Sequence, residues 1–476
     1  MKVLFCTSEC SPFFKTGGLG DVAGALPKEL KEKGIDVRVV LPFSSKISEE
    51  LRNQCEDIYE FTVGVGWRRQ YCGVKLLHHN SIDYYFIDNE YYFNRPNIYG
   101  DFDDGEKFAF FQMAIIEMLE KVDFVPDVMH LNDHHTAMIP FLLKEKYNWI
   151  ESYSHIKTIL TIHNLEFQGV YGKEILPELF GLGYDRYDDG TIRFHDAVNF
   201  MKAGILYSAK VTTVSPNYAN EIQTPEFGFG LDPILRMESH KLCGILNGID
   251  YEVFNPETDP KLNHHYNSDS LEMKKLNKAD LQERVGLPVR DDVPLIGLVS
   301  RLTYQKGFHI LLAEMENLLQ FDVQVVLLGT GDPMFENQFE YFGHKYPEKT
   351  SINISFDETL AQQIYAGSDV FLMPSATEPC GLSQMMAMRY GTLPIVHEVG
   401  GLKDSVIPYN PITGEGTGFG FSNFESYFLM EVIKKAIFLY IDDKVAFEKL
   451  MKQAMNTDFS WSHSCEQYIA LYNEVI

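Results

Sequence analysis

The sequence predicts an α/β protein with two parallel-sheet domains. Three observations predict this fold class. Short apolar runs, typical of buried strands, alternate along the chain with amphipathic helical patterns. This alternation stops in a polar, proline-containing stretch after Asn247 and then begins again. The length of 476 residues also exceeds what one compact core usually holds, and it suits two domains of roughly 200 residues each.

The first half begins with a predicted strand–helix–strand unit. The run "KVLFCTSE" predicts a strand, residues 21–33 predict a helix that Gly34 closes, and "DVRVVLP" predicts the next strand. A helix between two strands is typical of a parallel sheet with right-handed crossovers. Further strands are expected at "DVMHL", "KTILTIHN" and "KVTTVS".

The second half repeats the pattern, with strands expected at "PLIGLVSRL", "VQVVLLGTGD" and "VFLMPS" and helices at "GFHILLAEMENLL" and "LAQQIYAGSD". We therefore expect Rossmann-like domains at 1–246 and 247–476, with the last helix, about 457–476, crossing back to the first domain. Domains of this kind can face each other across a deep cleft that the carboxyl ends of their strands line.

Composition excludes several classes of partner. Lys plus Arg number 41 and Asp plus Glu 67, a formal net charge of −26 that repels nucleic acid and anionic membranes. No apolar stretch approaches the roughly 20 residues of a membrane span, and no signal peptide is expected. The seven cysteines are scattered without a CxxC pair, which favours neither a zinc ribbon nor a disulfide framework. We expect a cytoplasmic protein and predict no particular oligomer.

The stretch "KTGGLGD", Lys15 to Asp21, precedes the first predicted helix and suits an anion. A helix N-terminus attracts negative charge, and Lys15 adds a full positive charge there. The alternatives are a tight turn without a ligand and a dinucleotide fingerprint, since Gly18 to Ala23 fit G-x-G-x-x-A. The fingerprint is disfavoured because the glycines do not directly follow the strand and no acidic residue ends the second strand.

A matching pair of cations follows the first strand of the second half. Arg301 and Lys306 stand in "SRLTYQKGF", between a buried strand and a helix. An arginine fork and a lysine point charge at this spacing can straddle a diphosphate. The alternative is a solvated loop, since surface basic residues are common.

A second anion cradle is expected at "EPCGLSQ". Gly381, Leu382 and Ser383 would present backbone N–H groups at a helix start, with Glu378 just ahead in reach of a ligand's hydroxyls. A carboxylate beside a phosphate cradle suits a sugar nucleotide. The alternative for Glu378 is an acid that compensates the helix dipole.

These motifs resemble those of bacterial glycogen synthases and plant starch synthases, ADP-glucose glucosyltransferases of the GT-B type with two Rossmann-like domains. The resemblance runs almost end to end and includes "KTGGLGDV", "HNLEFQG", "NFMKAGILYSAKVTTVSPNYANEIQTPEFGFGLD", "GILNGIDYEVFNP", "VSRLTYQKGF", "EPCGLSQMMAMRYGTLPIV" and "GGLKDSV". It implies transfer of glucose from ADP-glucose to the 4-hydroxyl at the non-reducing end of an α-1,4-glucan, with the anomeric configuration retained.

The resemblance also implies roles for particular residues. The catalytic group comprises Arg301 and Lys306 at the donor diphosphate, Glu378 at the donor glucose hydroxyls, and His163. The substrate-binding group comprises Lys15, Gly18, Asp21, Asp133, Asn247, Gly381, Leu382 and Ser383. Asp133, His163 and Asn247 would line the glucose and acceptor side, and Asp21 would orient the glycine loop.

No metal or other cofactor is expected. The cluster His130, Asp133, His134 and His135 offers zinc ligands, but the resemblance implies a cleft loop there. No carboxylate pair suggests the nucleophile and acid of a retaining glycosidase, so we expect a same-face mechanism in which the leaving phosphate takes the acceptor proton.

Several positions depart from the family's usual motifs. His134 stands where tryptophan is usual, Ala376 and Thr377 precede "EPCG", and "DDGEKF" replaces "DNAERF". These departures bear on acceptor preference. Aromatic residues crowd 84–111, and Tyr91, Tyr92 or Tyr99 could touch glucan, although core packing is the more common use of such residues.

Two alternative functions remain open from the sequence. One is a related enzyme that uses UDP-glucose or makes a small disaccharide. The other is an inactive glucan-binding homologue, against which the joint retention of Lys15, Arg301, Lys306 and Glu378 argues.

Overall fold

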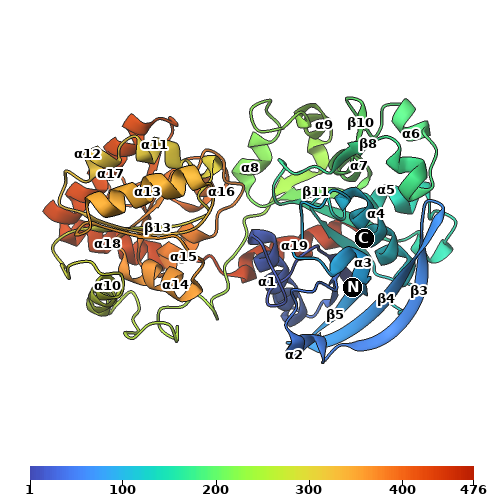
Figure 1. Cartoon of the computed structure of the whole chain (residues 1–476), viewed down its shortest axis with the longest axis horizontal. Helices are drawn as coiled ribbons and strands as arrows, with labels where there is room; N and C mark the ends of the chain where they lie inside the picture. Colours follow the sequence, from blue (N-terminus) through green and yellow to red (C-terminus); the bar gives the residue numbers. More distant parts are fainter. The chain divides into compact units, whose positions relative to one another are not determined.

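The computed structural model describes residues 1–476. The chain divides into two compact α/β units, Met1–Asn247 together with Trp461–Ile476, and Gly248–Ser460 (Figure 1). None of the helices combines the length and the apolar character that a membrane crossing requires.

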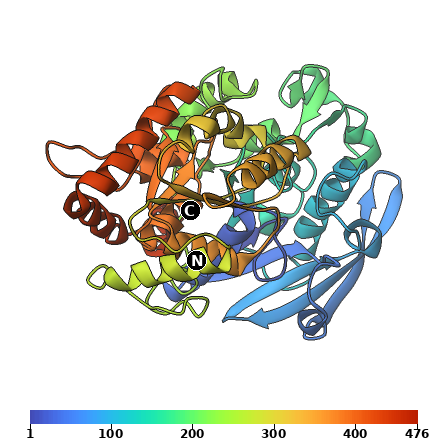
Figure 2. The ribbon, with the colours of Figure 1, turned by 60° about the vertical axis from the view of Figure 1, so that its left-hand side comes forward.

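The first unit is built on a nine-stranded sheet in the order β12-β11-β7-β6-β1-β2-β5-β4-β3. All neighbours pair in parallel except β3–β4 and β4–β5, which form the long antiparallel ribbon seen in blue in Figure 2. A small antiparallel sheet has the order β8-β10-β9. The strands are β1 (Lys2–Cys6), β2 (Asp36–Pro42), β3 (Glu56–Val65), β4 (Arg68–His79), β5 (Ile82–Asp88), β6 (Val128–Asn132), β7 (Lys157–Ile162), β8 (Val170–Gly172), β9 (Arg193–Phe194), β10 (Ala197–Asn199), β11 (Lys210–Thr213) and β12 (Leu242–Gly244).

The C-terminal helix α19 (Trp461–Val475) belongs to this unit and packs beside α1 (Gly18–Glu32), as Figure 1 shows. Tyr468 and Tyr472 of α19 are fully buried in the core under the sheet. The remaining helices are α2 (Glu49–Arg52), α3 (Glu90–Phe93), α4 (Asp104–Met118), α5 (Ile139–Glu145), α6 (Asp185–Asp188), α7 (Phe200–Tyr207), α8 (Pro216–Glu221) and α9 (Asp232–Met237), with short turns at Glu151–Tyr153, Leu176–Phe180 and Ser239–Lys241.

The second unit has a six-stranded, fully parallel sheet in the order β15-β14-β13-β16-β17-β18. Helices cover both faces of this sheet (Figure 1). The strands are β13 (Leu295–Val299), β14 (Gln324–Leu328), β15 (Thr350–Asn353), β16 (Val370–Met373), β17 (Leu393–His397) and β18 (Phe419–Phe421). The helices are α10 (Glu272–Arg284), α11 (Phe308–Leu312), α12 (Met315–Leu318), α13 (Pro333–Lys345), α14 (Glu358–Gly367), α15 (Ser383–Arg389), α16 (Gly400–Ser405), α17 (Ser426–Asp442) and α18 (Lys444–Met455).

Two predicted helices differ from the structure. The first begins at Gly18 rather than at residue 21, so the glycines form its first turn instead of a loop before it. The second, predicted as one helix over "GFHILLAEMENLL", is broken into α11 and α12. The Glu314 amide donates a hydrogen bond to the carbonyl of Leu311, three residues earlier, and this forms a tighter turn than an α-helix. Helix α12 follows this turn and buries Met315 and Leu318.

Candidate active site

In the first unit, the candidate site residues follow three adjacent parallel strands. Strand β1 pairs with β6, and β6 pairs with β7. The carboxyl ends of parallel strands lie at one edge of a sheet, where ligands of such folds bind. Glu9 follows β1, Asp133 follows β6 and His163 follows β7, so all three lie at this edge.

The glycine loop is held by a residue that sequence reasoning missed. The buried Glu9 carboxylate accepts hydrogen bonds from the Thr16 amide at 2.8 Å, the Thr16 hydroxyl at 2.7 Å and the Gly20 amide at 3.1 Å. Burial raises the pKa of Glu9, and these hydrogen bonds oppose that shift. The predicted anion at this helix start is therefore, in part, the chain's own carboxylate. Its position at a strand end is the only sequence signal for it.

Gly20 must be glycine because of this close packing. A Cβ at Gly20 would lie 2.4 Å from the Cβ of Lys15. The Lys15 ammonium extends to Asp21, with Nζ 2.7 Å from Oδ1. The structure thus brings Lys15 and Asp21 together, while Gly18 takes the first position of α1.

Replacing Glu9 with alanine should loosen this loop. The Thr16 and Gly20 amides would lose their buried acceptor, a change of about 1–3 kcal/mol. Hydrogen exchange at these amides should accelerate by about 10-fold or more. The control Glu50→Ala removes an exposed carboxylate of α2 and should leave these amides unchanged. Equal exchange in both variants would show that Glu9 does not hold the loop.

Asp133 and His163 contact each other directly. Asp133 has a positive φ of 56° and accepts a hydrogen bond from the His163 backbone amide at 2.7 Å. Burial raises the pKa of Asp133 to about 7 and lowers that of His163 to about 3. The His163 imidazole is therefore neutral at ordinary pH. Its Nε2 lies 2.8 Å from Oδ1 of Asn132.

The raised pKa of Asp133 predicts a pH-dependent stability. The pKa of Asp133 is about 7 in the folded protein and 3.8 in the unfolded chain. The contribution of Asp133 to the free energy of unfolding is therefore complete below pH 3.8 and is lost as the pH rises through 7. Asp133→Asn removes the ionisation and keeps an oxygen acceptor. The variant should gain about 3 kcal/mol of unfolding free energy relative to the wild type between about pH 5 and pH 8.

This change is measured by denaturant unfolding at each pH. The exposed Asp185→Asn variant serves as the control and should show no such trend. A difference between Asp133→Asn and the wild type that stays constant with pH would contradict the assignment.

The neighbouring histidines are used within the fold. His130 is buried between the Tyr472 and Thr161 hydroxyls, each 2.7 Å from a ring nitrogen. His135 stacks on Tyr99, whose hydroxyl lies 2.7 Å from that of Ser8. No three His, Cys, Asp or Glu side chains gather into a set that could hold a metal ion.

Other first-unit residues that sequence reasoning singled out have different surroundings. Asn247 is buried and its Oδ1 has no hydrogen-bond partner. His134 is half-buried beside His135, with ring centroids 3.8 Å apart. Tyr92 packs in the core, whereas Tyr91 is exposed.

In the second unit, Lys306 and Glu378 form an ion pair at the ends of two adjacent strands. Strand β13 leads to Lys306 and its neighbour β16 leads to Glu378. Lys306 Nζ donates to Glu378 Oε2 at 2.6 Å, and the Ser375 hydroxyl donates to the same oxygen at 2.9 Å. The pair is largely buried. Arg301, on the same loop as Lys306, is exposed and forms no ion pair.

Close backbone packing fixes this pair. Gly307 has a φ of 75°, and a Cβ there would lie 1.8 Å from the Pro374 carbonyl oxygen. The Gln305 backbone carbonyl accepts a hydrogen bond from the Ala376 amide. The Gln305 side-chain amide donates a hydrogen bond to the Thr377 hydroxyl at 3.0 Å. The two unusual residues Ala376 and Thr377 therefore tie the two loops together.

The segment after Glu378 offers free amides. Helix α15 begins at Ser383 without a side-chain cap, and the Gly381 and Leu382 amides make no backbone hydrogen bond. Glu378 does not cap this helix, because its carboxylate faces Lys306. The Gly401 backbone amide donates a hydrogen bond to the Glu378 backbone carbonyl at 3.1 Å, which helps to fix the position of Glu378.

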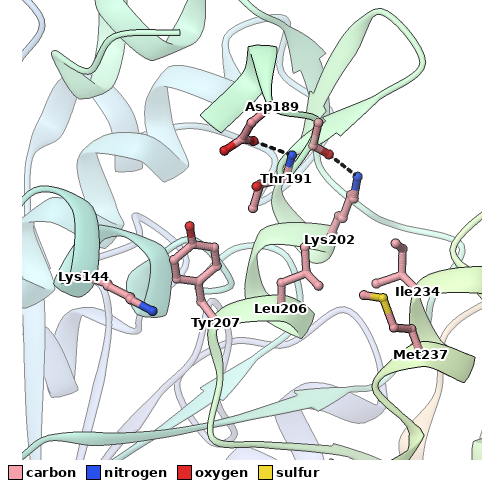
Figure 3. A pocket seen from close by; sticks show the side chains of 9 residues that line it. Lys144, Asp189, Thr191, Lys202, Leu206, Tyr207, Ile234 and Met237 are labelled. Atoms are coloured by element: carbon pink, nitrogen blue, oxygen red, sulfur yellow. Dashed lines mark hydrogen bonds between the residues drawn. The ribbon is translucent and has the colours of Figure 1, made fainter. Parts of the chain in front are cut away.

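A cavity of about 470 Å³ lies elsewhere in the first unit (Figure 3). Its polar groups largely satisfy one another: Lys202 donates to the Gly190 and Arg193 carbonyls, and the Thr191 amide donates to Asp189. None of the predicted site residues lines it. The lining residues are Lys144, Asp189, Gly190, Thr191, Lys202, Leu206, Tyr207, Ile234 and Met237.

Comparison with known protein families covers most of the chain. The family described as starch synthase catalytic domain matches residues 2–237, and glycosyl transferases group 1 matches residues 281–450. Glycogen synthases from Streptococcus sanguinis strain SK36 and Ligilactobacillus salivarius strain UCC118 are each 61% identical, over 100% of both chains.

Solved structures agree with this relationship. The catalytic domain of starch synthase IV from Arabidopsis thaliana, bound to ADP and acarbose, superposes with a TM-score of 0.91 and 32% identity over 100% of this chain and 99% of that one. Sucrose-phosphate synthase from Thermosynechococcus elongatus, at 17% identity and a TM-score of 0.62 over 100% and 98%, shares the two-domain glycosyltransferase fold. The full-length identity to the curated synthases is decisive, and this chain belongs to the glycogen synthase family.

Proposed function

We propose that this chain transfers glucose from ADP-glucose to the 4-hydroxyl at the non-reducing end of an α-1,4-glucan, with the anomeric configuration retained. Membership of the glycogen synthase family supports the reaction class, and the similar Arabidopsis synthase holds ADP. The observation that carries the proposal is the buried Lys306–Glu378 pair, on loops that also carry the unpaired Arg301 and the free amides of Gly381 and Leu382.

The second unit would then bind the nucleotide diphosphate. Arg301 can fork onto phosphate oxygens without losing a protein partner. Lys306 adds a second positive charge at a position that Glu378 fixes. Negative charge develops on the departing diphosphate, and fixed cations and amides stabilise it most where water is excluded. The Gly381, Leu382 and Ser383 amides extend the same cradle.

The first unit would hold the glucose and the acceptor. Lys15 would contact the donor on leaving Asp21, and Gly18 would allow close approach of the backbone. The carboxyl of Asp133 and the neutral His163 offer hydrogen bonds to sugar hydroxyls, and the unpartnered Oδ1 of Asn247 offers an acceptor. We propose the first unit, Met1–Asn247 with Trp461–Ile476, as this acceptor-side domain and the second unit, Gly248–Ser460, as the nucleotide-sugar domain.

The bond changes follow a same-face course. The bond between glucose C1 and the diphosphate oxygen breaks, the acceptor O4 bonds to C1 on the same face, and the O4 proton passes to the departing phosphate. Neither carboxyl is arranged as a free nucleophile, because Glu378 is bound to Lys306 and Ser375 and Asp133 is bound to the His163 amide. A covalent glucosyl-enzyme trapped on either residue would refute this course.

A competition assay tests the proposed donor. The protein is incubated with glycogen and equal concentrations of ADP-glucose and UDP-glucose, whose glucose units carry two different isotopic labels. We expect label from ADP-glucose to enter the glucan in linkages that an α-1,4-specific glucosidase releases. Preferred incorporation from UDP-glucose would overturn the donor assignment. No incorporation from either donor would indicate an inactive glucan-binding homologue.

A further inference from the structure

Asn132 lies at the end of β6 and is fully buried between two elements of the site. Its Nδ2 lies 2.9 Å from the backbone carbonyl oxygen of Cys6, at the end of β1. A carbonyl oxygen only accepts hydrogen bonds, so the amide nitrogen of Asn132 must face Cys6. The amide oxygen Oδ1 must then face His163, whose Nε2 is 2.8 Å away.

This orientation determines the state of the His163 ring. An amide oxygen only accepts, so Nε2 of His163 must carry the proton. The ring is neutral because burial lowers its pKa to about 3. A neutral imidazole has one proton, which leaves Nδ1 as an acceptor. No group of the chain donates a hydrogen bond to Nδ1, and the Asp133 carboxyl holds the His163 backbone in place.

We propose that Asn132 is a positioning residue that fixes His163 as the Nε2–H tautomer, so that Nδ1 accepts a hydrogen bond from a hydroxyl of the bound sugar. The role of the sugar rests on the proposed function, whereas the tautomer rests on the contacts of Asn132 alone. The ring then orients its substrate as an acceptor and donates no proton to the reaction. Asp133 and His130 are the titratable neighbours, and His130 is also kept neutral by burial.

Nitrogen NMR of the full-length protein labelled with ¹⁵N-histidine tests the tautomer directly, with His163→Gln used to identify the His163 signals. In the wild type we expect a protonated Nε2 and an unprotonated Nδ1 at pH 6 to 8. Asn132→Leu removes the acceptor, so both nitrogens should shift towards a mixture of tautomers. Asn132→Asp keeps an acceptor oxygen, so Nε2 of His163 should stay protonated at pH 8. The added negative charge should raise the pKa of the His163 ring, so that its second nitrogen becomes protonated at lower pH.

Kinetics separate a positioning role from a structural one. Asn132→Leu should lower kcat/KM by about 10- to 100-fold, and Asn132→Asp should recover most of it at pH 8. Asn277→Leu, which removes a buried asparagine in the second unit, is the control and should change neither the His163 signals nor kcat/KM. A proton on Nδ1 in the wild type, or an unchanged tautomer and kcat/KM in Asn132→Leu, would overturn the proposal.

The two proposals fail in distinguishable ways. If the wild type transfers no glucose, the proposed function fails while the NMR result still decides the tautomer. If the wild type is active but Asn132→Leu keeps full kcat/KM, the positioning role fails and the proposed function stands. If Asn132→Leu does not fold, Asn132→Asp still tests the tautomer. A proton on Nδ1 of His163 in that variant at pH 8 would contradict the proposal.

Discussion

Replacing Lys306 with alanine is expected to lower kcat for glucose transfer by about 10³-fold. In the proposed reaction, negative charge builds up on the departing diphosphate. Lys306 is a cation held in place for it by the Glu378 carboxylate, which also accepts a hydrogen bond from the Ser375 hydroxyl. The same substitution leaves Glu378 as an unpaired buried carboxylate. Stability should therefore fall as well, by about 3 kcal/mol.

A second variant separates these two effects. In Lys306→Ala combined with Glu378→Gln, no buried charge is left unpaired, so the free energy of unfolding should return towards that of the wild type. Turnover should stay low, because the cation is still missing. Recovery of turnover together with stability would show that Lys306 has only a structural role. Lys345→Ala, which breaks an exposed pair with Glu316, is the control for loss of a lysine charge.

Arg301→Ala should reduce kcat/KM for ADP-glucose by about 10²- to 10³-fold without changing stability. Arg301 is exposed and pairs with no acidic group, so its removal leaves nothing buried without a partner. The expected loss is in binding the diphosphate as it departs. Arg301→Lys should recover only part of the loss, because lysine keeps the charge but not the two-pronged hydrogen bonding.

The matched control for Arg301 is Arg290→Ala. Arg290 is also in the second unit but binds Asp292 and Asp322 at the surface. Its loss should leave kcat/KM unchanged. If Arg301→Ala kept the wild-type kcat/KM, Arg301 would not bind the diphosphate, and only Lys306 and the backbone amides would remain as candidates for that role.

Eight strands of the two large sheets could be predicted, because buried parallel strands are short runs of apolar residues; they are β1, β2, β6, β7, β11, β13, β14 and β16. The antiparallel ribbon of β3, β4 and β5, the small three-stranded sheet and the strands β12, β15, β17 and β18 were missed. The start of helix α1 could not be predicted. Glycines usually indicate a turn, but here the Glu9 carboxylate, which follows β1, accepts hydrogen bonds from amides at the helix start. The break between α11 and α12 was also missed, since an unbroken amphipathic pattern gives no sign of a tightened turn.

Within the candidate site, the charged residues of distinctive motifs could be identified from the sequence, and their partners could not. The sequence motifs predict Lys306 at the donor diphosphate and Glu378 at the donor glucose hydroxyls, and the ion pair between them follows from the adjacency of β13 and β16. Glu9 was missed because its role depends on how the loop after β1 folds back onto it, through hydrogen bonds from Thr16 and Gly20. Asn132 was missed because it binds groups at the ends of two neighbouring strands, β1 and β7. Such contacts depend on the order of β1, β6 and β7 in the sheet, which a single sequence does not give.

The carboxylate of Glu9 at the start of α1 has an electrostatic consequence for selectivity. Around the glycine loop, the one positive charge of Lys15 stands against two negative charges, Glu9 and Asp21. Around the second-unit loops, Arg301 and Lys306 outnumber Glu378. In a chain of net charge −26, we therefore expect discrimination for a nucleotide anion to reside in the second unit, and we expect the first unit to select a neutral sugar by shape and hydrogen bonding.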